Sequence, residues 1–169
     1  MLKIFTFIFV SINLLAATAQ QSSSELFVQF EKFHSLKRVL YIAAHPDDEN
    51  TRALAWFSLS EKAETAYLSL TRGDGGQNLI GEELGANLGL LRSQELLQAR
   101  AIDGSTQFFS RAVDFGYSRS ADESFNKWNK DEVLKDVVTI IRQFKPDVIV
   151  LNTGNALVDG FKESIIMGK

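Results

Sequence analysis

A histidine and three carboxylates stand together at residues 45–49, which read His-Pro-Asp-Asp-Glu. His45 and Asp48 are three residues apart, and Pro46 restricts the backbone between them. An imidazole nitrogen and a carboxylate oxygen are ligands that bind divalent metals such as Zn²⁺. If both reach one ion, Asp47 between them is free to activate a water. The spacing therefore predicts a metal site at His45 and Asp48 with Asp47 as the base.

These residues also fit a simpler alternative, in which they begin a helix. Asp47 or Asp48 would then be the N-cap, and Glu49 would favour the positive end of the helix dipole. The segment before them favours the metal site, because residues 39–42 form an apolar run typical of a buried strand. The motif would then lie at the carboxyl end of a strand over 37–44, which is where open α/β sheets bind ligands.

The rest of the chain alternates between apolar runs and helical apolar stripes. This alternation predicts a parallel sheet with right-handed crossovers, and hence an α/β fold. A tail at 153–169 shows no strong strand pattern. The expected strands are 37–44, 64–70, 106–109 and 148–151, and the expected helices are 51–59, 90–101 and 131–144.

The segment Ala-His-Pro-Asp-Asp-Glu after a first strand resembles the signature of the LmbE-like (PIG-L) zinc-dependent de-N-acetylases, over about residues 37–152. The resemblance implies a Rossmann-like three-layer sandwich with a mostly parallel sheet. It also implies His45 and Asp48 as ligands of Zn²⁺ or another divalent metal, and Asp47 as general base. The implied substrate is a small N-acetylated sugar or glycoconjugate, from which an acetyl group on N-acetylglucosamine is removed.

The resemblance also implies a substrate pocket. A glycine-rich loop at 71–78 would line it, Arg92 would reach into it from a helix, and Asp114 would bind a sugar hydroxyl. Each has an alternative. In these alternatives the loop is an ordinary connection, Arg92 pairs with Glu95 three residues on, and Asp114 hydrogen-bonds its own backbone in a turn.

A third metal ligand in the family comes from a His-rich segment further along the chain. This sequence holds two histidines, His34 and His45, and His34 is expected to be structural at the end of a helix. The resemblance therefore implies that the C-terminal part of the fold is missing and that metal binding is impaired, unless Asp159 or Glu163 supplies an oxygen. The alternative function is a non-catalytic carbohydrate-binding remnant of that fold.

Composition narrows the function classes. The chain has 169 residues, of which 45% are hydrophobic and 23% charged, a profile typical of one globular domain. The net charge of −3 without a basic stretch argues against nucleic acid as a partner, and the absence of cysteine excludes disulfides and thiolate sites. The glycines match neither nucleotide-binding fingerprint, which argues against a nucleotide-binding domain. The oligomeric state is unknown from sequence.

The N-terminal residues have the pattern of a secretory signal peptide over 1–19. Lys3 precedes an apolar run at 4–17, and Ala17-Thr18-Ala19 is a small-x-small cleavage site. An uncleaved anchor is the alternative, although the run is short for a membrane span. We expect a secreted or periplasmic protein with no stable membrane span after cleavage. A polar leader and a short helix with an apolar stripe follow at 20–36.

Overall fold

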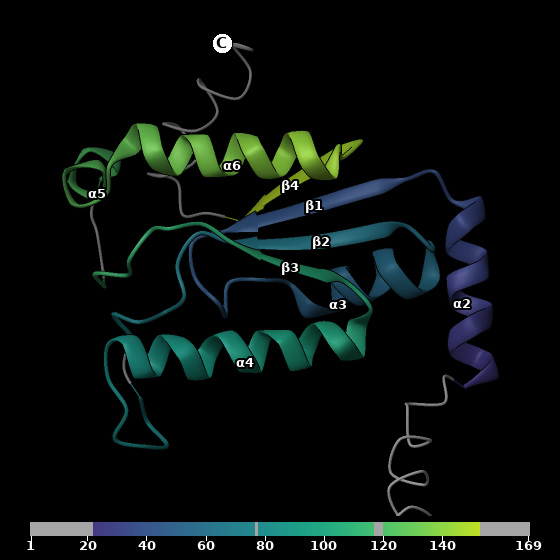
Figure 1. Cartoon of the computed structure of the whole chain (residues 1–169), viewed down its shortest axis with the longest axis horizontal. Helices are drawn as coiled ribbons and strands as arrows, with labels where there is room; N and C mark the ends of the chain where they lie inside the picture. Colours follow the sequence, from purple (N-terminus) through teal and green to yellow (C-terminus); the bar gives the residue numbers. More distant parts are fainter. Residues whose placement is uncertain (1–21, 77, 117–119, 153–169) are drawn as a thin grey trace, which may run out of the picture. The chain divides into compact units, whose positions relative to one another are not determined.

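Four parallel strands form the sheet in a computed structural model of the chain, which describes residues 22–76, 78–116 and 120–152. They run in the order β3-β2-β1-β4, so that β1 and β2 are flanked on both sides (Figure 1). All four expected strands are confirmed, and so is the α/β class. The bounds are β1 Arg38–Ala43, β2 Glu64–Ser69, β3 Thr106–Phe109 and β4 Val148–Asn152.

The carboxyl ends of the strands are aligned. Ala43 at the end of β1 pairs with Ser69 of β2 on one side and with Asn152 of β4 on the other. Ser69 in turn pairs with Phe109 at the end of β3. Because parallel strands in register end at one edge, the loops after β1, β2 and β3 leave the sheet side by side.

The helix α6 Lys130–Phe144 covers one face of the sheet, and α5 Ala121–Lys127 lies on the same side, past the carboxyl ends of the strands (Figure 1). The α6 helix has the apolar stripe that the sequence predicts, and its N-cap is Asn129. The α5 helix was not predicted, since its apolar residues are sparse; Ser120 caps it. The core of this face consists mainly of aliphatic and aromatic side chains, among them Leu40, Ile42, Leu68, Trp128, Val133, Val137, Ile140 and Phe144.

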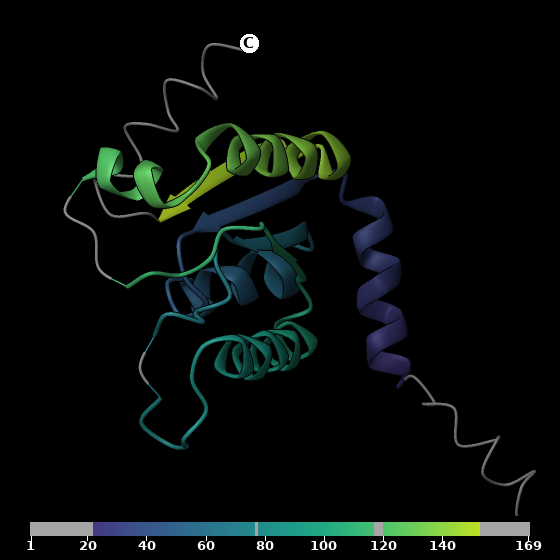
Figure 2. The same ribbon diagram turned by 60° about the vertical axis from the view of Figure 1, so that its left-hand side comes forward.

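The other face is covered by α3 Thr51–Ala55, which continues as a π-helix η1 Trp56–Ser60, and by α4 Ala86–Asp103 (Figure 2). Asn50 caps α3 by accepting a hydrogen bond from Ala53 N. The helix therefore begins after the His-Pro-Asp-Asp-Glu segment, and neither Asp47 nor Asp48 is its N-cap. The core on this face is smaller and contains Tyr41, Ala43, Leu54, Tyr67 and Leu96. Helices on both faces of the sheet give the expected three layers.

The helix α2 Ser23–His34 belongs to a separate compact unit and is described by itself. It confirms the short helix expected in 20–36, and its apolar side chains Leu26, Phe27, Phe30 and Phe33 are exposed. No helix of the described ranges has the length and apolarity needed to cross a bilayer. The expected signal peptide at 1–19, the tail at 153–169 and its Asp159 and Glu163 lie outside the described residues.

Candidate active site

The turn after β1 brings the side chains of His45 and Asp48 together. Nδ1 of His45 lies 3.1 Å from Oδ2 of Asp48, and that oxygen also accepts a hydrogen bond from His45 N at 3.0 Å. Neighbouring strands hold the turn by its carbonyl groups. The Tyr67 hydroxyl on β2 donates to His45 O, and Nδ2 of Asn152 on β4 donates to Asp48 O, each at 2.5 Å.

The separation of the two donors fits a shared metal ion. Two ligands of one tetrahedral Zn²⁺, each about 2.0–2.2 Å from the ion, lie about 3.3 Å apart. On the other side of the ring, Nε2 of His45 lies 3.7 Å from Oδ1 of Asp114. If a metal were held between Nδ1 and Asp48, a carboxylate on this opposite side would favour the proton on Nε2, an arrangement common behind metal-bound histidines.

A third protein donor does not join this pair within the described residues, where no group of three or more His, Cys, Asp or Glu side chains could hold a metal. Asp114 lies on the Nε2 side of the ring, so it cannot share an ion with Nδ1 of His45 and Asp48. The residues therefore fit two positions of a metal's coordination shell. The remaining positions require water, substrate or a donor from elsewhere.

Asp47 lies between the two donors in the sequence and is exposed to solvent over 72% of its side chain. Its Oδ2 lies 3.8 Å from Nη1 of Arg92, which comes from the first half of α4. The alternative pairing of Arg92 with Glu95 is not found among the ion pairs of the described residues. The helix α4 thus delivers Arg92 to the turn after β1.

Asp114 follows β3 and is only 6% exposed at its side chain. Its Oδ1 accepts a hydrogen bond from Gly116 N at 2.9 Å, which is the turn interaction that the sequence allowed. Its other oxygen, Oδ2, has no partner among the residues described. The same carboxylate therefore supports a turn and faces His45.

The glycine-rich loop after β2 packs against the segment that carries Asp114. A Cβ on Gly75 would lie 2.4 Å from the backbone oxygen of Asp114, so only glycine permits this approach. Asp74 Oδ1 accepts a hydrogen bond from Asp114 N at 3.2 Å. Here the glycine brings two loops of the protein together. Gly73 lies beside Arg92 and Pro46, but none of the described residues of this loop lines the pocket between the turn and α4.

A buried ion cluster behind the turn was missed by sequence reasoning. Arg100 of α4 has a side chain only 3% exposed, and its Nη2 lies 3.3 Å from Glu49 Oε1 and 2.7 Å from Asp103 Oδ2. Glu49 thus pairs with an arginine far along the chain rather than with Arg52, three residues after it. Arg100 lies over the ring of Tyr67, 5.3 Å from its centroid. The spacing of Arg100 and Asp103 was the available signal, but it did not indicate burial.

The electrostatics follow from these contacts. The hydrogen bond with Asp48 raises the pKa of His45, and the same bond lowers the pKa of Asp48. Burial is the main cause of a raised pKa at Glu49, with Arg100 acting in the opposite direction. Burial also raises the pKa of Tyr67 far above its ordinary value, so its hydroxyl remains a hydrogen-bond donor.

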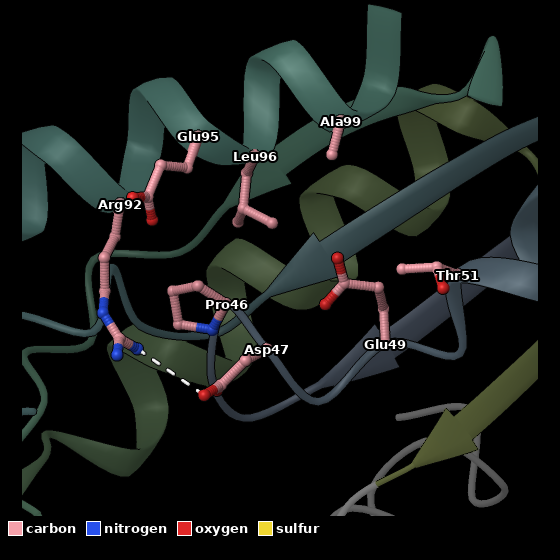
Figure 3. A pocket seen from close by; sticks show the side chains of 8 residues that line it. All are labelled: Pro46, Asp47, Glu49, Thr51, Arg92, Glu95, Leu96 and Ala99. Atoms are coloured by element: carbon pink, nitrogen blue, oxygen red, sulfur yellow. Dashed lines mark ion pairs between the residues drawn. The ribbon is translucent and has the colours of Figure 1, made fainter. Parts of the chain in front are cut away.

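A pocket of about 350 Å³ opens between this turn and α4 (Figure 3). Asp47 and Arg92 form one end of it, and the carboxylate of Glu49 extends toward α4 in its middle. The other lining residues are Pro46, Thr51, Glu95, Leu96 and Ala99. The candidate base therefore borders a space large enough for a small organic ligand.

Known proteins resemble the chain in sequence and in fold. The family described as GlcNAc-PI de-N-acetylase (PIG-L) matches residues 40–156. The diacetylchitobiose deacetylase of Thermococcus kodakarensis is 31% identical over 131 residues, which is 72% of this chain and 42% of that protein.

Two solved structures share the fold at lower identity. The N,N′-diacetylchitobiose deacetylase of Pyrococcus horikoshii, solved with an inhibitor, has a TM-score of 0.51 at 21% identity, covering 78% of this chain and 50% of its own. GalB, the 4-carboxy-2-hydroxymuconate hydratase of Pseudomonas putida, has a TM-score of 0.52 at 20% identity. The match covers 68% of this chain and 46% of GalB. The chain thus spans half or less of the length of each relative.

Proposed function

The chain belongs to the GlcNAc-PI de-N-acetylase (PIG-L) family, and from that premise we propose that it is a metal-dependent deacetylase of an N-acetylglucosamine-type glycoside. The fold alone does not decide this, because a hydratase and a deacetylase share it. The observation that carries the proposal is the pairing of His45 Nδ1 with Asp48 Oδ2 at 3.1 Å beside an exposed Asp47.

The reaction needs one water and one base. A divalent metal held by His45 and Asp48 would supply Lewis acidity toward the acetyl carbonyl and toward water. The oxygen of the attacking water bonds to the acetyl carbon, and Asp47 takes a proton from that water. The carbon–nitrogen bond then breaks, and the proton passes to the leaving nitrogen, so that acetate and a free amine are released.

Two further residues would orient the reactants. Arg92 holds Asp47 through their ion pair and directs its carboxylate toward the pocket. Asp114 would accept a hydrogen bond from a sugar hydroxyl through Oδ2, while Oδ1 keeps its turn contact with Gly116. We also propose, from residues 1–19 alone, that the protein is exported.

The catalytic proposal is tested by replacing Asp47 with Asn. Removing the base should lower kcat by about 10²–10⁴-fold, with little change in KM, because general base catalysis contributes that much. Acetate release from N,N′-diacetylchitobiose is the measurement. Asp122→Asn is the control, since Asp122 is exposed on α5. Equal rates for both variants would exclude Asp47 as the base.

The metal proposal is tested by titrating Zn²⁺ into the 169-residue polypeptide. With two protein donors, we expect micromolar or weaker affinity, and His45→Ala or Asp48→Ala should weaken it further by more than the roughly 10–100-fold typical of outer-shell changes. Unchanged affinity in both variants would place the metal elsewhere. Tight binding with rapid turnover would contradict the expected impairment.

A non-catalytic carbohydrate-binding protein is the alternative, because the described residues supply two metal donors rather than three. Acetate release distinguishes the deacetylase from the binding protein. A binding protein would retain N,N′-diacetylchitobiose affinity without releasing acetate at any Zn²⁺ concentration, and Asp47→Asn would then change nothing measurable.

A further inference from the structure

The pocket beside Asp47 extends past the residues used in the proposed reaction. Beyond Asp47 and Arg92 it continues along α4, where Leu96 and Ala99 form an apolar wall and Glu95 lies at the rim (Figure 3). Its volume of about 350 Å³ exceeds what an acetyl group needs. A second ligand moiety would therefore fit here while the acetamido group lies at Asp47.

Glu49 carries an oxygen without a partner at this place. Its side chain is only 6% exposed, and its Oε1 faces Arg100 at 3.3 Å. Its Oε2 is buried and has no hydrogen-bond partner in the described part of the chain. A buried carboxylate oxygen is destabilising without a donor. A small rotation of the carboxylate about its soft last torsion would present Oε2 to a donor in the pocket.

The charges around the pocket are unequal. Three carboxylates line it, from Asp47, Glu49 and Glu95, against the single guanidinium of Arg92. Arg92 is already paired with Asp47 at 3.8 Å. Behind the wall, Arg100 is shared between Glu49 and Asp103, so it does not offset the excess. The pocket therefore repels anions and attracts hydrogen-bond donors.

We propose that this pocket binds the part of the substrate beyond the acetylated sugar, and that it selects a neutral or cationic hydroxyl-rich unit over an anionic one. The proposal rests on the proposed deacetylase function and narrows its substrate class. Sugar hydroxyls or an ammonium group donate to Glu49 and Glu95, and a sugar face packs on Leu96 and Ala99. A phosphate or carboxylate in the same position meets the carboxylates of Glu49 and Glu95, and the cation beside Glu49, Arg100, is already shared with Asp103.

The test compares two disaccharides of equal size. N,N′-diacetylchitobiose is neutral, and N-acetylglucosaminyl-glucuronic acid carries one negative charge. Binding to the full chain is measured by calorimetry with a chelator present, so that no metal attracts the acidic probe. We expect the neutral disaccharide to bind about tenfold more tightly, and the difference to shrink at high salt.

A matched pair of variants identifies the residue responsible. Glu95→Gln removes one negative charge from the pocket, and Gln98→Lys adds one positive charge three residues along the same exposed surface of α4, outside the pocket. Both change the net charge by +1. Glu95→Gln should bind the acidic disaccharide more tightly and so reduce the affinity ratio of the neutral to the acidic disaccharide by about threefold. Gln98→Lys should leave this affinity ratio nearly unchanged.

The binding results separate a failure of the selectivity from a failure of the pocket proposal. Equal affinity of the wild type for both probes, or equal effects of the two variants, overturns the selectivity and leaves the deacetylase proposal intact. A wild type that binds neither disaccharide overturns the pocket proposal and contradicts the N-acetylglucosamine substrate. Acetate release from the neutral disaccharide is measured in parallel, so that the two failures are distinguishable.

Discussion

Two arginines on opposite faces of the sheet each form ion pairs with two carboxylates, and their side chains differ in burial. Arg100 on the α4 face pairs with Glu49 and Asp103, and its side chain is 3% exposed. Arg111 on the α6 face pairs with Asp136 and Glu132, and its side chain is 53% exposed. The ion chemistry is the same, but one cluster lies in the interior and the other in water.

This difference separates the roles of the two faces. The interior cluster joins α4 to Glu49, which immediately follows the candidate metal ligands, and Arg100 also lies over Tyr67, whose hydroxyl holds His45 O. The exterior cluster joins the segment after β3 to α6, whose inner side packs in the larger apolar core. We infer that the α4 face positions the site and the α6 face mainly stabilises the sheet.

The largest effect is expected from Arg100→Met. The variant leaves Glu49 and Asp103 buried without a cation, so the free energy of unfolding should fall by about 3–5 kcal/mol. Chemical denaturation measures the change. Arg111→Met is the matched control, because it removes an arginine with two carboxylates from an exposed position, and it should destabilise much less. Equal losses would remove the distinction between the two clusters.

The second-largest loss of stability is expected from a cavity created in the larger apolar core. Val137 of α6 is 1% exposed, and Val137→Ala should lower the free energy of unfolding by about 2 kcal/mol. Zn²⁺ affinity of the folded protein should not change, since α6 has no residue in the site. A change in metal affinity would show that the α6 face also positions the turn.

Tyr67→Phe tests the α4 face more directly. The variant keeps the ring under Arg100 and removes the donor to His45 O, which should destabilise the protein by about 1–2 kcal/mol. Unlike Val137→Ala, it should also weaken Zn²⁺ binding, because the turn is less restrained. Destabilisation with unchanged metal affinity would leave Tyr67 a purely structural residue.

The smallest effect concerns pH and the exterior cluster. The hydrogen bond from Arg111 lowers the pKa of Asp136 below its ordinary 3.8. The folded state therefore binds this proton more weakly than the unfolded state. The stabilisation is present above the unfolded pKa and is lost as pH falls through the folded pKa. The stability difference between wild type and Asp136→Asn, small at neutral pH, should disappear at strongly acidic pH.

Sequence patterns predicted the long helix on each face of the sheet and missed smaller features. The apolar stripe of α6 and the apolar run of β1 arise from burial of aliphatic side chains, which periodicity reports directly. The helix α5 was missed because its single large apolar residue, Phe125, gives no period. The π-helical continuation of α3 was also missed, since periodicity does not distinguish it from an α-helix.

The candidate site could be predicted where the residues are close in the chain. His45, Asp47 and Asp48 needed only a strand end and a proline to be placed together. Arg92 and Asp114 came from the resemblance, since nothing local to them indicates a position beside the turn. The charge of Arg100 indicated a surface position, and its burial depends on partners at Glu49 and Asp103 that only the tertiary structure joins.

The central position of β1 in the sheet determines the order in which the strands unfold locally. Neighbours bond β1 on both sides, whereas β3 and β4 are the outer strands of the described sheet. Amide hydrogens of Leu40 and Ile42 should therefore exchange with solvent deuterium among the slowest, after those of the outer strands have exchanged. Partial fraying of the protein would leave the His45 turn anchored on its most persistent strand.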